Sequence, residues 1–202
     1  MDKVINNNGF DYVDLGLPSG TLWATMNVGA SNPSDAGLFF QWGDTQGYTA
    51  EQVGKDKQFS RADYKWNIDG SYSNFSKYKT MGATLELEDD AANANMGGSW
   101  HMPTPTQINE LINNTTSTWT TQDNVKGRLF TSKNNGKSIF IPAAGMAWKS
   151  SVNNSGNSAI VWSSMLGMGY VGYGQYFFSY SGDAYLYNFG RYLGYSVRGV
   201  IG

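Results

Sequence analysis

Aromatic residues separated by glycine constrain the fold of this chain more than any other feature of its sequence. Phe, Trp and Tyr make up 15% of the 202 residues, and the chain contains 25 glycines. Glycine favours turns and weakens helices, because it has the most conformational freedom to lose. The pattern therefore argues against a helical bundle and favours short strands joined by long, ordered loops.

The charge and length of the chain limit the partners that we expect. Only 15% of the residues are charged and the net charge is −2, against about 25% charged residues in an average globular protein. Because no basic stripe is present, nucleic acid is not an expected partner. No apolar run approaches the roughly 20 residues of a membrane helix, so we expect no membrane insertion. The length fits a single domain over residues 1–202.

The chain contains no cysteine, which removes disulfides, thiolate metal sites and cysteine nucleophiles together. Residues 1–7 include no apolar h-region, so we expect no signal peptide in the chain as given. A virion protein or a trimmed extracellular protein would begin in the same way. We therefore expect the protein in a virion, outside the cell or at the cell surface.

Short apolar or alternating runs bounded by turn residues predict the strands. Residues 46–78 are polar with scattered aromatic residues and show little helical or strand periodicity. They predict an extended surface loop. The Asn-Asn-Gly run at 134–136 predicts a hairpin. The expected strands are residues 12–15, 21–26, 38–42, 128–131, 138–142, 160–163, 176–180 and 195–200.

Two helices can be placed. Thr104 and Gln107 have the spacing of a capping box, and Pro105 suits the first helical position. Apolar residues at 108, 111 and 112 follow on one face. The second helix is expected at about residues 85–95, with acidic residues in its first turns and Gly-Gly after it. Two helices against a small, twisted, mostly antiparallel sheet with long loops predict the α+β class.

Several segments occur in the order known from one family. They are VDLGLPSGTLWA at 13–24, NVGA at 27–30, QWGD at 41–44, DAA at 90–92, GGSWHMPT at 97–104, SIFIPAAG at 138–145, WSS at 162–164 and SVRGV at 196–200. Together they resemble the Fibrobacter-type major paralogous domain, which is common in gut Bacteroidetes and their phages. The resemblance covers residues 11–200 and implies a C-type-lectin-like fold of the formylglycine-generating-enzyme kind. At His101 the family usually has arginine, so a charge contact there is not carried over.

The same fold serves the variable proteins of diversity-generating retroelements, such as phage tropism determinants. In these proteins adenines are mutagenised in the C-terminal segment that follows a Trp-Ser-Ser-like motif, and Asn codons become Tyr, Ser, Asp or Gly. Residues 165–195 of this chain resemble such a hypervariable segment, because they hold eight of the 13 tyrosines among Gly, Ser, Asp and Asn. We therefore expect residues 165–195 to be a variable ligand-binding region.

Catalysis is not expected. The formylglycine-generating enzymes use active-site cysteines, which this chain lacks. His101 is the only histidine and is interpreted as structural, although a carboxylate within hydrogen-bond reach would point to a degenerate enzyme. Glu86, Glu88, Asp89 and Asp90 have the chemistry of calcium ligands, but their position is typical of an acidic helix start. We expect no cofactor and no metal.

The expected function is ligand binding, with a protein or glycan on a cell surface as the partner. An exposed tyrosine offers a large contact area, and only a few side-chain torsions lose their freedom when it binds. The alternative is an undiversified carbohydrate-binding module of a bacterial cell-surface protein. Alternation in residues 176–180 puts Tyr176, Phe178 and Tyr180 on one face, where they are interpreted as core. The binding surface is then expected on two loops that carry Tyr170, Tyr173, Asp183, Tyr185, Tyr187, Asn188, Arg191 and Tyr192.

Overall fold

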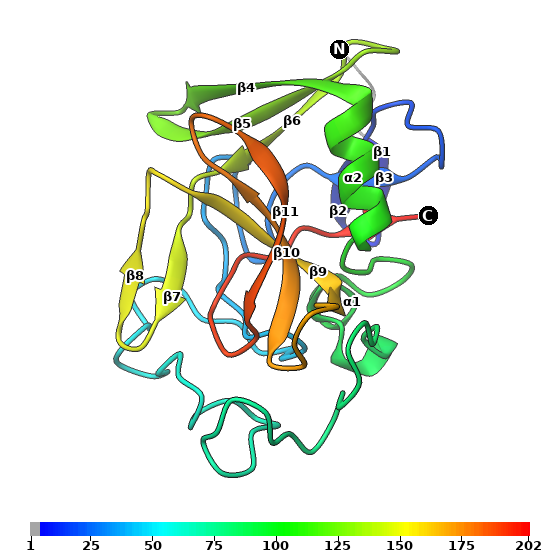
Figure 1. Cartoon of the computed structure of the whole chain (residues 1–202). Helices are drawn as coiled ribbons and strands as arrows, with labels where there is room; N and C mark the ends of the chain where they lie inside the picture. Colours follow the sequence, from blue (N-terminus) through cyan, green and yellow to red (C-terminus); the bar gives the residue numbers. More distant parts are fainter. Residues whose placement is uncertain (1–4) are drawn as a thin grey trace.

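Most of the regular structure in this protein is β-sheet. A computed structural model describes residues 5–202, with 38% of residues in strand and 10% in helix (Figure 1). The strands of this part of the chain form four small antiparallel sheets. The α+β class that the sequence predicts, with two helices against one small sheet in a C-type-lectin-like fold, is therefore wrong. The two expected helices are present, but they are short beside the sheets.

One sheet brings together distant parts of the chain, and a second is built from strands of its C-terminal third. The first has the order β1-β2-β3-β12 and joins the two ends of the chain. The second has the order β11-β10-β9, so β11 lies at an edge. The strands are β1 (Ile5–Asn7), β2 (Phe10–Asp14), β3 (Leu22–Ala24), β12 (Val200–Ile201), β9 (Ala159–Leu166), β10 (Tyr173–Ser179) and β11 (Ala184–Gly190).

The other two sheets are formed by strands that are consecutive in the chain: one is a three-stranded meander and the other is a hairpin. Their orders are β4-β5-β6 and β7-β8. The hairpin predicted at 134–136 is confirmed, because it joins β5 and β6 in an antiparallel pair. The Thr-rich strand β4 was not predicted. The strands are β4 (Thr115–Gln122), β5 (Val125–Ser132), β6 (Ser138–Pro142), β7 (Met146–Trp148) and β8 (Ser151–Asn153).

The helices begin at side-chain caps. The capping box predicted for α2 (Pro105–Asn114) is confirmed: the Gln107 amide donates to Thr104 Oγ1, and the Thr104 amide donates to Gln107 Oε1. The other helix is shorter than predicted. A 3₁₀ turn η1 (Leu87–Asp89) precedes α1 (Ala91–Met96), whose cap Asp90 accepts a bond from the Asn93 amide. No helix between residues 5 and 202 is long and apolar enough to cross a membrane.

Residues 46–78 contain no helix or extended strand, as predicted, but they are more than a surface loop. They run below the sheets in the view of Figure 1, drawn in cyan to blue-green. Four aromatic side chains point inward and are buried. Such a segment is held by its anchored rings, since backbone ladders are nearly absent from it. The buried aromatics are Phe59, Tyr64, Trp66 and Phe75.

The core contains interlocked tryptophans. Trp42 and Trp162 are fully buried, and each indole donates to the chain segment that carries the other. Trp42 Nε1 donates to the Ser163 carbonyl at 3.0 Å, and Trp162 Nε1 donates to the Phe40 carbonyl at 2.7 Å. The residue 39–42 segment forms only isolated bridges, not the predicted strand. These two hydrogen bonds therefore attach the residue 39–42 segment to β9.

We expect Trp162→Ala to destabilise the protein by about 3–5 kcal/mol, because it removes a fully buried ring and an indole hydrogen bond. Tyr185→Ala and Tyr187→Ala remove rings that are 36% and 52% exposed, and each should cost below about 1 kcal/mol. Urea unfolding followed by circular dichroism measures all three. Equal losses in the three variants would contradict the assignment of Tyr185 and Tyr187 to the surface.

Candidate ligand-binding site

Residues 184–190 form an edge strand, where the sequence predicted a loop. Side chains of a strand alternate between its faces. In β11, Tyr185, Tyr187 and Phe189 are exposed, at 36%, 52% and 45%. Ala184 and Leu186 point to the other face and pack on the cluster beneath α2. The expectation of a loop is wrong, but the exposure expected for Tyr185 and Tyr187 is confirmed.

The exposed rings rest on partly or fully buried rings of β10. Tyr187 is opposite Tyr176, with ring centroids 6.0 Å apart, and Tyr185 is opposite Phe178, at 5.5 Å. Tyr176 in turn contacts Trp162 at 5.7 Å. Cross-strand aromatic pairs of this kind stabilise a sheet and restrict the rotamers of both partners. The aromatic face of β11 is therefore ordered before any ligand arrives.

The three aromatics interpreted as core have different positions. Tyr176 is buried, as expected, and Phe178 is half-buried against the main core cluster. Tyr180 is 41% exposed, because it lies at the turn between β10 and β11, where its amide donates to the Asp183 carbonyl. The assignment of Tyr180 to the core is wrong: the alternation is correct, but the strand ends at Ser179.

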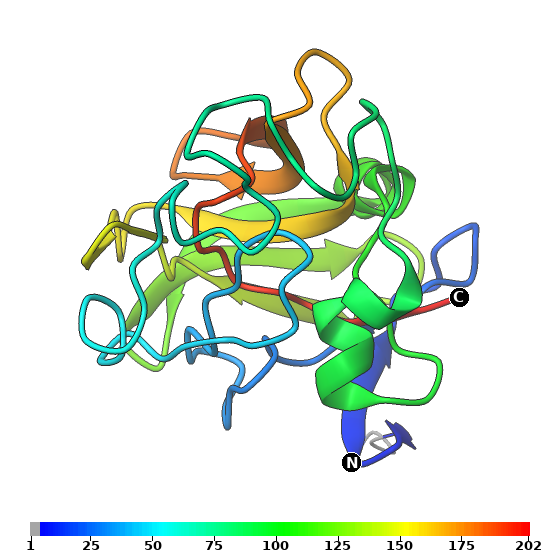
Figure 2. The same ribbon diagram turned by 90° about the horizontal axis from the view of Figure 1, so that it is seen from below.

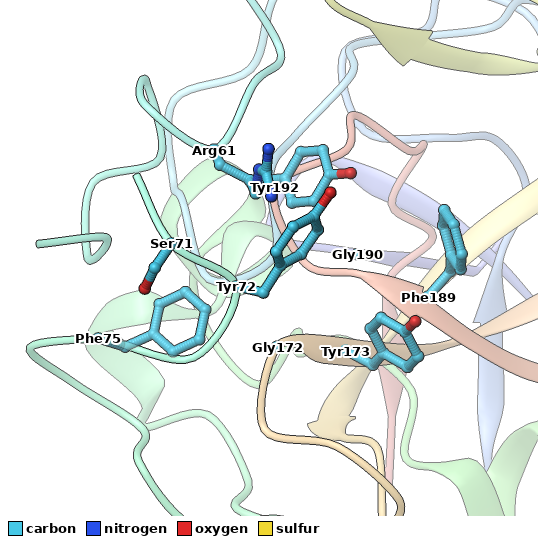
Figure 3. A pocket seen from close by; sticks show the side chains of 9 residues that line it. All are labelled: Arg61, Ser71, Tyr72, Phe75, Gly172, Tyr173, Phe189, Gly190 and Tyr192. Atoms are coloured by element: carbon cyan, nitrogen blue, oxygen red, sulfur yellow. The ribbon is translucent and has the colours of Figure 1, made fainter. Parts of the chain in front are cut away.

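The expected residues Tyr170, Tyr173 and Tyr192 lie beside a pocket of about 240 Å³ at the other end of β11. Tyr173 contacts Tyr170 at 5.0 Å and Phe189 at 5.4 Å. Figure 3 shows Tyr173 and Phe189 on one side of the pocket and Tyr72, Tyr192 and Arg61 on the other. Burial raises the pKa of Tyr192, and so does the neighbouring Tyr72, so the Tyr192 hydroxyl stays a neutral donor and acceptor.

Four of the nine residues that line this pocket come from the long loop, and sequence reasoning missed them. The Arg61 guanidinium stacks 3.5 Å from the centre of the Tyr72 ring. The main chain of Tyr72 packs closely against Gly172 of the C-terminal segment. A Cβ atom added to Gly172 would lie only 2.5 Å from the Tyr72 carbonyl oxygen. Figure 2 shows this loop, in blue-green, beside the orange and red C-terminal segment. The aromatic residues in 64–78 could have indicated a binding surface in the loop. The segment they pack against is about a hundred residues away in the sequence, so no local pattern links the two.

Arg191 was expected on the ligand surface, and this is wrong. It is completely buried. Its Nη1 donates to the carbonyls of Tyr78 and Val171 at 2.9 and 3.2 Å, and its Nη2 donates to that of Lys77 at 3.0 Å. The guanidinium also lies 3.7 Å from the centre of the Phe75 ring. Burial lowers the pKa of the Arg191 guanidinium. Arg191 thus joins the long loop to the C-terminal segment.

Asp183 and Asn188 flank the aromatic face. Asp183 is exposed in the β10–β11 turn, and its carboxylate accepts a bond from the Ala184 amide at 2.8 Å. Its carbonyl accepts bonds from Ser179 Oγ and Arg128 Nη2, both at 2.9 Å. Asn188 is half-buried on the opposite face from Tyr187, where its Cβ approaches Gly167. Of these two, only Asp183 is on the exposed side with the rings.

The acidic residues before α1 surround a lysine. Glu86, Glu88 and Asp89 bring carboxylate oxygens within 4.8 Å of one another. Lys77 Nζ lies 2.6, 2.9 and 2.6 Å from these three carboxylates, in the same order. Hydrogen bonds to Asp89, Glu86 and Glu88 raise the pKa of Lys77. One ammonium therefore lies among these three carboxylates and offsets part of their negative charge.

His101 makes main-chain contacts. Its Nδ1 lies 2.9 Å from the Met102 carbonyl oxygen and its Nε2 lies 3.1 Å from that of Gly202. Both ring nitrogens face main-chain oxygens, so the His101 side chain links residue 202 to the segment before α2.

Comparisons with models of known protein families, with curated proteins and with solved structures give no match to this chain.

We expect Arg191→Met to destabilise the protein by several kcal/mol, because it removes three hydrogen bonds from a buried guanidinium to part-buried carbonyls, each worth about 1–3 kcal/mol. Limited proteolysis should then cut within residues 60–78 first. The matched control is Arg61→Met, which removes a half-buried guanidinium that stacks on one ring. If the unfolding curves of the two variants coincide, Arg191 does not link the long loop to the C-terminal segment.

Proposed function

We propose that this protein is a ligand-binding protein that recognises a protein or glycan on a cell surface. The observation that carries the proposal is the row of exposed aromatic rings on β11, at Tyr185, Tyr187 and Phe189, which continues into the pocket at Tyr173. Solvent-exposed aromatics grouped on one face are typical of binding surfaces. Buried rings beneath them keep the row in place, so little order is lost on binding.

The energetics of such a surface support specific binding. A covered aromatic side chain removes about 150–250 Å² from water, which corresponds to several kcal/mol at about 25 cal/mol per Å² before ordering costs. A few such rings reach micromolar affinity, which needs about 8 kcal/mol. Because tyrosine freezes only two torsions and also offers a hydroxyl, it suits proteins as well as glycans.

We further propose that the segment is diversified, as in the variable proteins of retroelements that it resembles. The supporting observation is a separation of exposed and buried positions within residues 165–195. Tyr180, Tyr185 and Tyr187 are exposed, while Tyr176 is buried and Arg191 is both buried and hydrogen-bonded. Exposed positions of an edge strand accept many side chains at small cost in stability. The scaffold therefore tolerates variation at its binding face.

The diversification proposal is tested at the gene. We expect a nearby reverse transcriptase and a template repeat that differs from the 3′ end of the gene only at adenines. The differences should fall at the codons of Tyr180, Tyr185, Tyr187 and Phe189, and not at those of the buried Arg191. A complete locus with no such repeat, or differences spread equally over buried codons, would contradict diversification and leave the binding proposal in place.

The binding proposal is tested on cells. We expect fluorescent protein to label target bacterial cells, and the double variant Tyr185→Ala with Tyr187→Ala to lose at least tenfold in affinity, which is about 1.4 kcal/mol. The matched control is Leu87→Ala, which removes a side chain that is 60% exposed but lies away from β11. Flow cytometry measures both. If the two variants bind equally well, the surface is assigned wrongly.

A further inference from the structure

A second pocket adjoins the one at Tyr173. It has a volume of about 370 Å³, and it shares Arg61, Tyr72 and Tyr192 with the first pocket. Its far side is formed by Trp148 and Lys149, at the end of β7. The three shared side chains therefore form a ridge between two hollows, and the two pockets together make one bipartite site. Neither Trp148 and Lys149 on its far side nor Arg61 on the shared ridge was expected from the sequence.

The walls of the second pocket combine flat rings with positive charge. Trp148 is 44% exposed and Tyr72 is 57% exposed, so both rings offer area to a ligand. The Lys149 ammonium lies 5.1 Å from the Trp148 ring, and the Arg61 guanidinium stacks on Tyr72. Each cation is thus held beside an aromatic surface. Ser60 adds a hydroxyl to the lining.

Both cations lack an acidic partner among residues 5–202. Lys65 and Lys77 pair with the acids of the η1 region, whereas Arg61 and Lys149 form no ion pair in that part of the chain. The nearby loop carboxylates do not line either pocket. Asp63 accepts a bond from Ser60 Oγ, and Asp69 accepts one from Asn74 Nδ2 at 2.9 Å. Arg61 and Lys149 therefore place two positive charges on the lining of the second pocket, and no carboxylate is among its lining residues.

We propose, on the basis of the binding function above, that the ligand is an acidic glycan and that Arg61 and Lys149 hold its anionic group. A sugar ring has an apolar C–H face, which matches the faces of Trp148 and Tyr72, and a rim of hydroxyls, which matches Ser60 and Tyr192. A carboxylate or sulfate on that sugar supplies the charge that the two cations lack. Guanidinium bonds to such anions are among the stronger hydrogen bonds in proteins.

The test is a glycan array that carries sialylated, uronic and sulfated oligosaccharides, each beside its neutral counterpart, together with a polyglutamate peptide. Hits are titrated by calorimetry. We expect at least one acidic glycan to bind at least tenfold more tightly than its neutral counterpart. The hits distinguish carboxylate from sulfate as the anionic group.

Matched variants separate charge from stacking. Arg61→Gln with Lys149→Gln should reduce the acidic-to-neutral preference at least tenfold, because both positive charges are removed. Trp148→Ala should weaken acidic and neutral forms by the same factor. Lys137→Gln removes an exposed lysine of the β5–β6 turn, which lines neither pocket, and it should leave the preference unchanged.

Four outcomes overturn the proposal. The first three are a neutral glycan bound as well as its acidic form, a preference that survives loss of Arg61 and Lys149, and a polyglutamate peptide that binds at the same residues while acidic glycans do not. The fourth is an array with no hit. In each case labelling of cells that depends on Tyr185 and Tyr187 would keep the proposed function, whereas loss of that dependence would remove the function itself.

Discussion

Buried arginines that donate to main-chain carbonyls are the interaction on which this structure depends. Arg128, Arg191 and Arg198 are at most 5% exposed and form no ion pair within residues 5–202. Arg198 donates to Ala24 and Phe140 carbonyls and to the Asn27 side chain, and so joins β3 to β6. Burial lowers the pKa of Arg198 to about 9, so the charge is still present at neutral pH. A chain with long irregular segments has many carbonyls without ladder partners, and one guanidinium with five donors satisfies several of them at once.

The same interaction determines where the binding surface can be. Arg191 bonds the long loop to the segment after β11, and Arg128 bonds the turn that carries Tyr180 and Asp183. Both ends of the aromatic face are thus fixed from beneath. Close packing also fixes β10 opposite Phe189, because a Cβ on Gly174 would lie 2.8 Å from the Trp162 ring. The rings on β11 are therefore presented on a rigid support, and the cost of ordering them has already been met during folding.

Local patterns in the sequence predicted the local structure well. The capping box of α2 and the hairpin at 134–136 depend on neighbours within a few residues, and both are confirmed. Some local predictions are wrong, since residues 184–190 form a strand and residues 38–42 do not. The larger errors concern contacts over long separations. The α+β class failed because most strands are short and pair in four separate sheets. Arg191 was placed on the surface because an arginine among glycines and tyrosines has no local sign of carbonyl partners more than a hundred residues earlier.

By itself, the sequence determined that this chain uses aromatic rings and glycine in place of long helices, and that its tyrosines gather near the C-terminus. Those properties follow from residue type and spacing, since turns and alternation are set over a few residues. Only the tertiary structure decided which rings are exposed. It also decided that Tyr72, Trp148 and the cations beside them meet the C-terminal segment. The reason is physical: exposure and charge pairing depend on which distant segments pack together, and that packing is selected by the whole core and not by any local window.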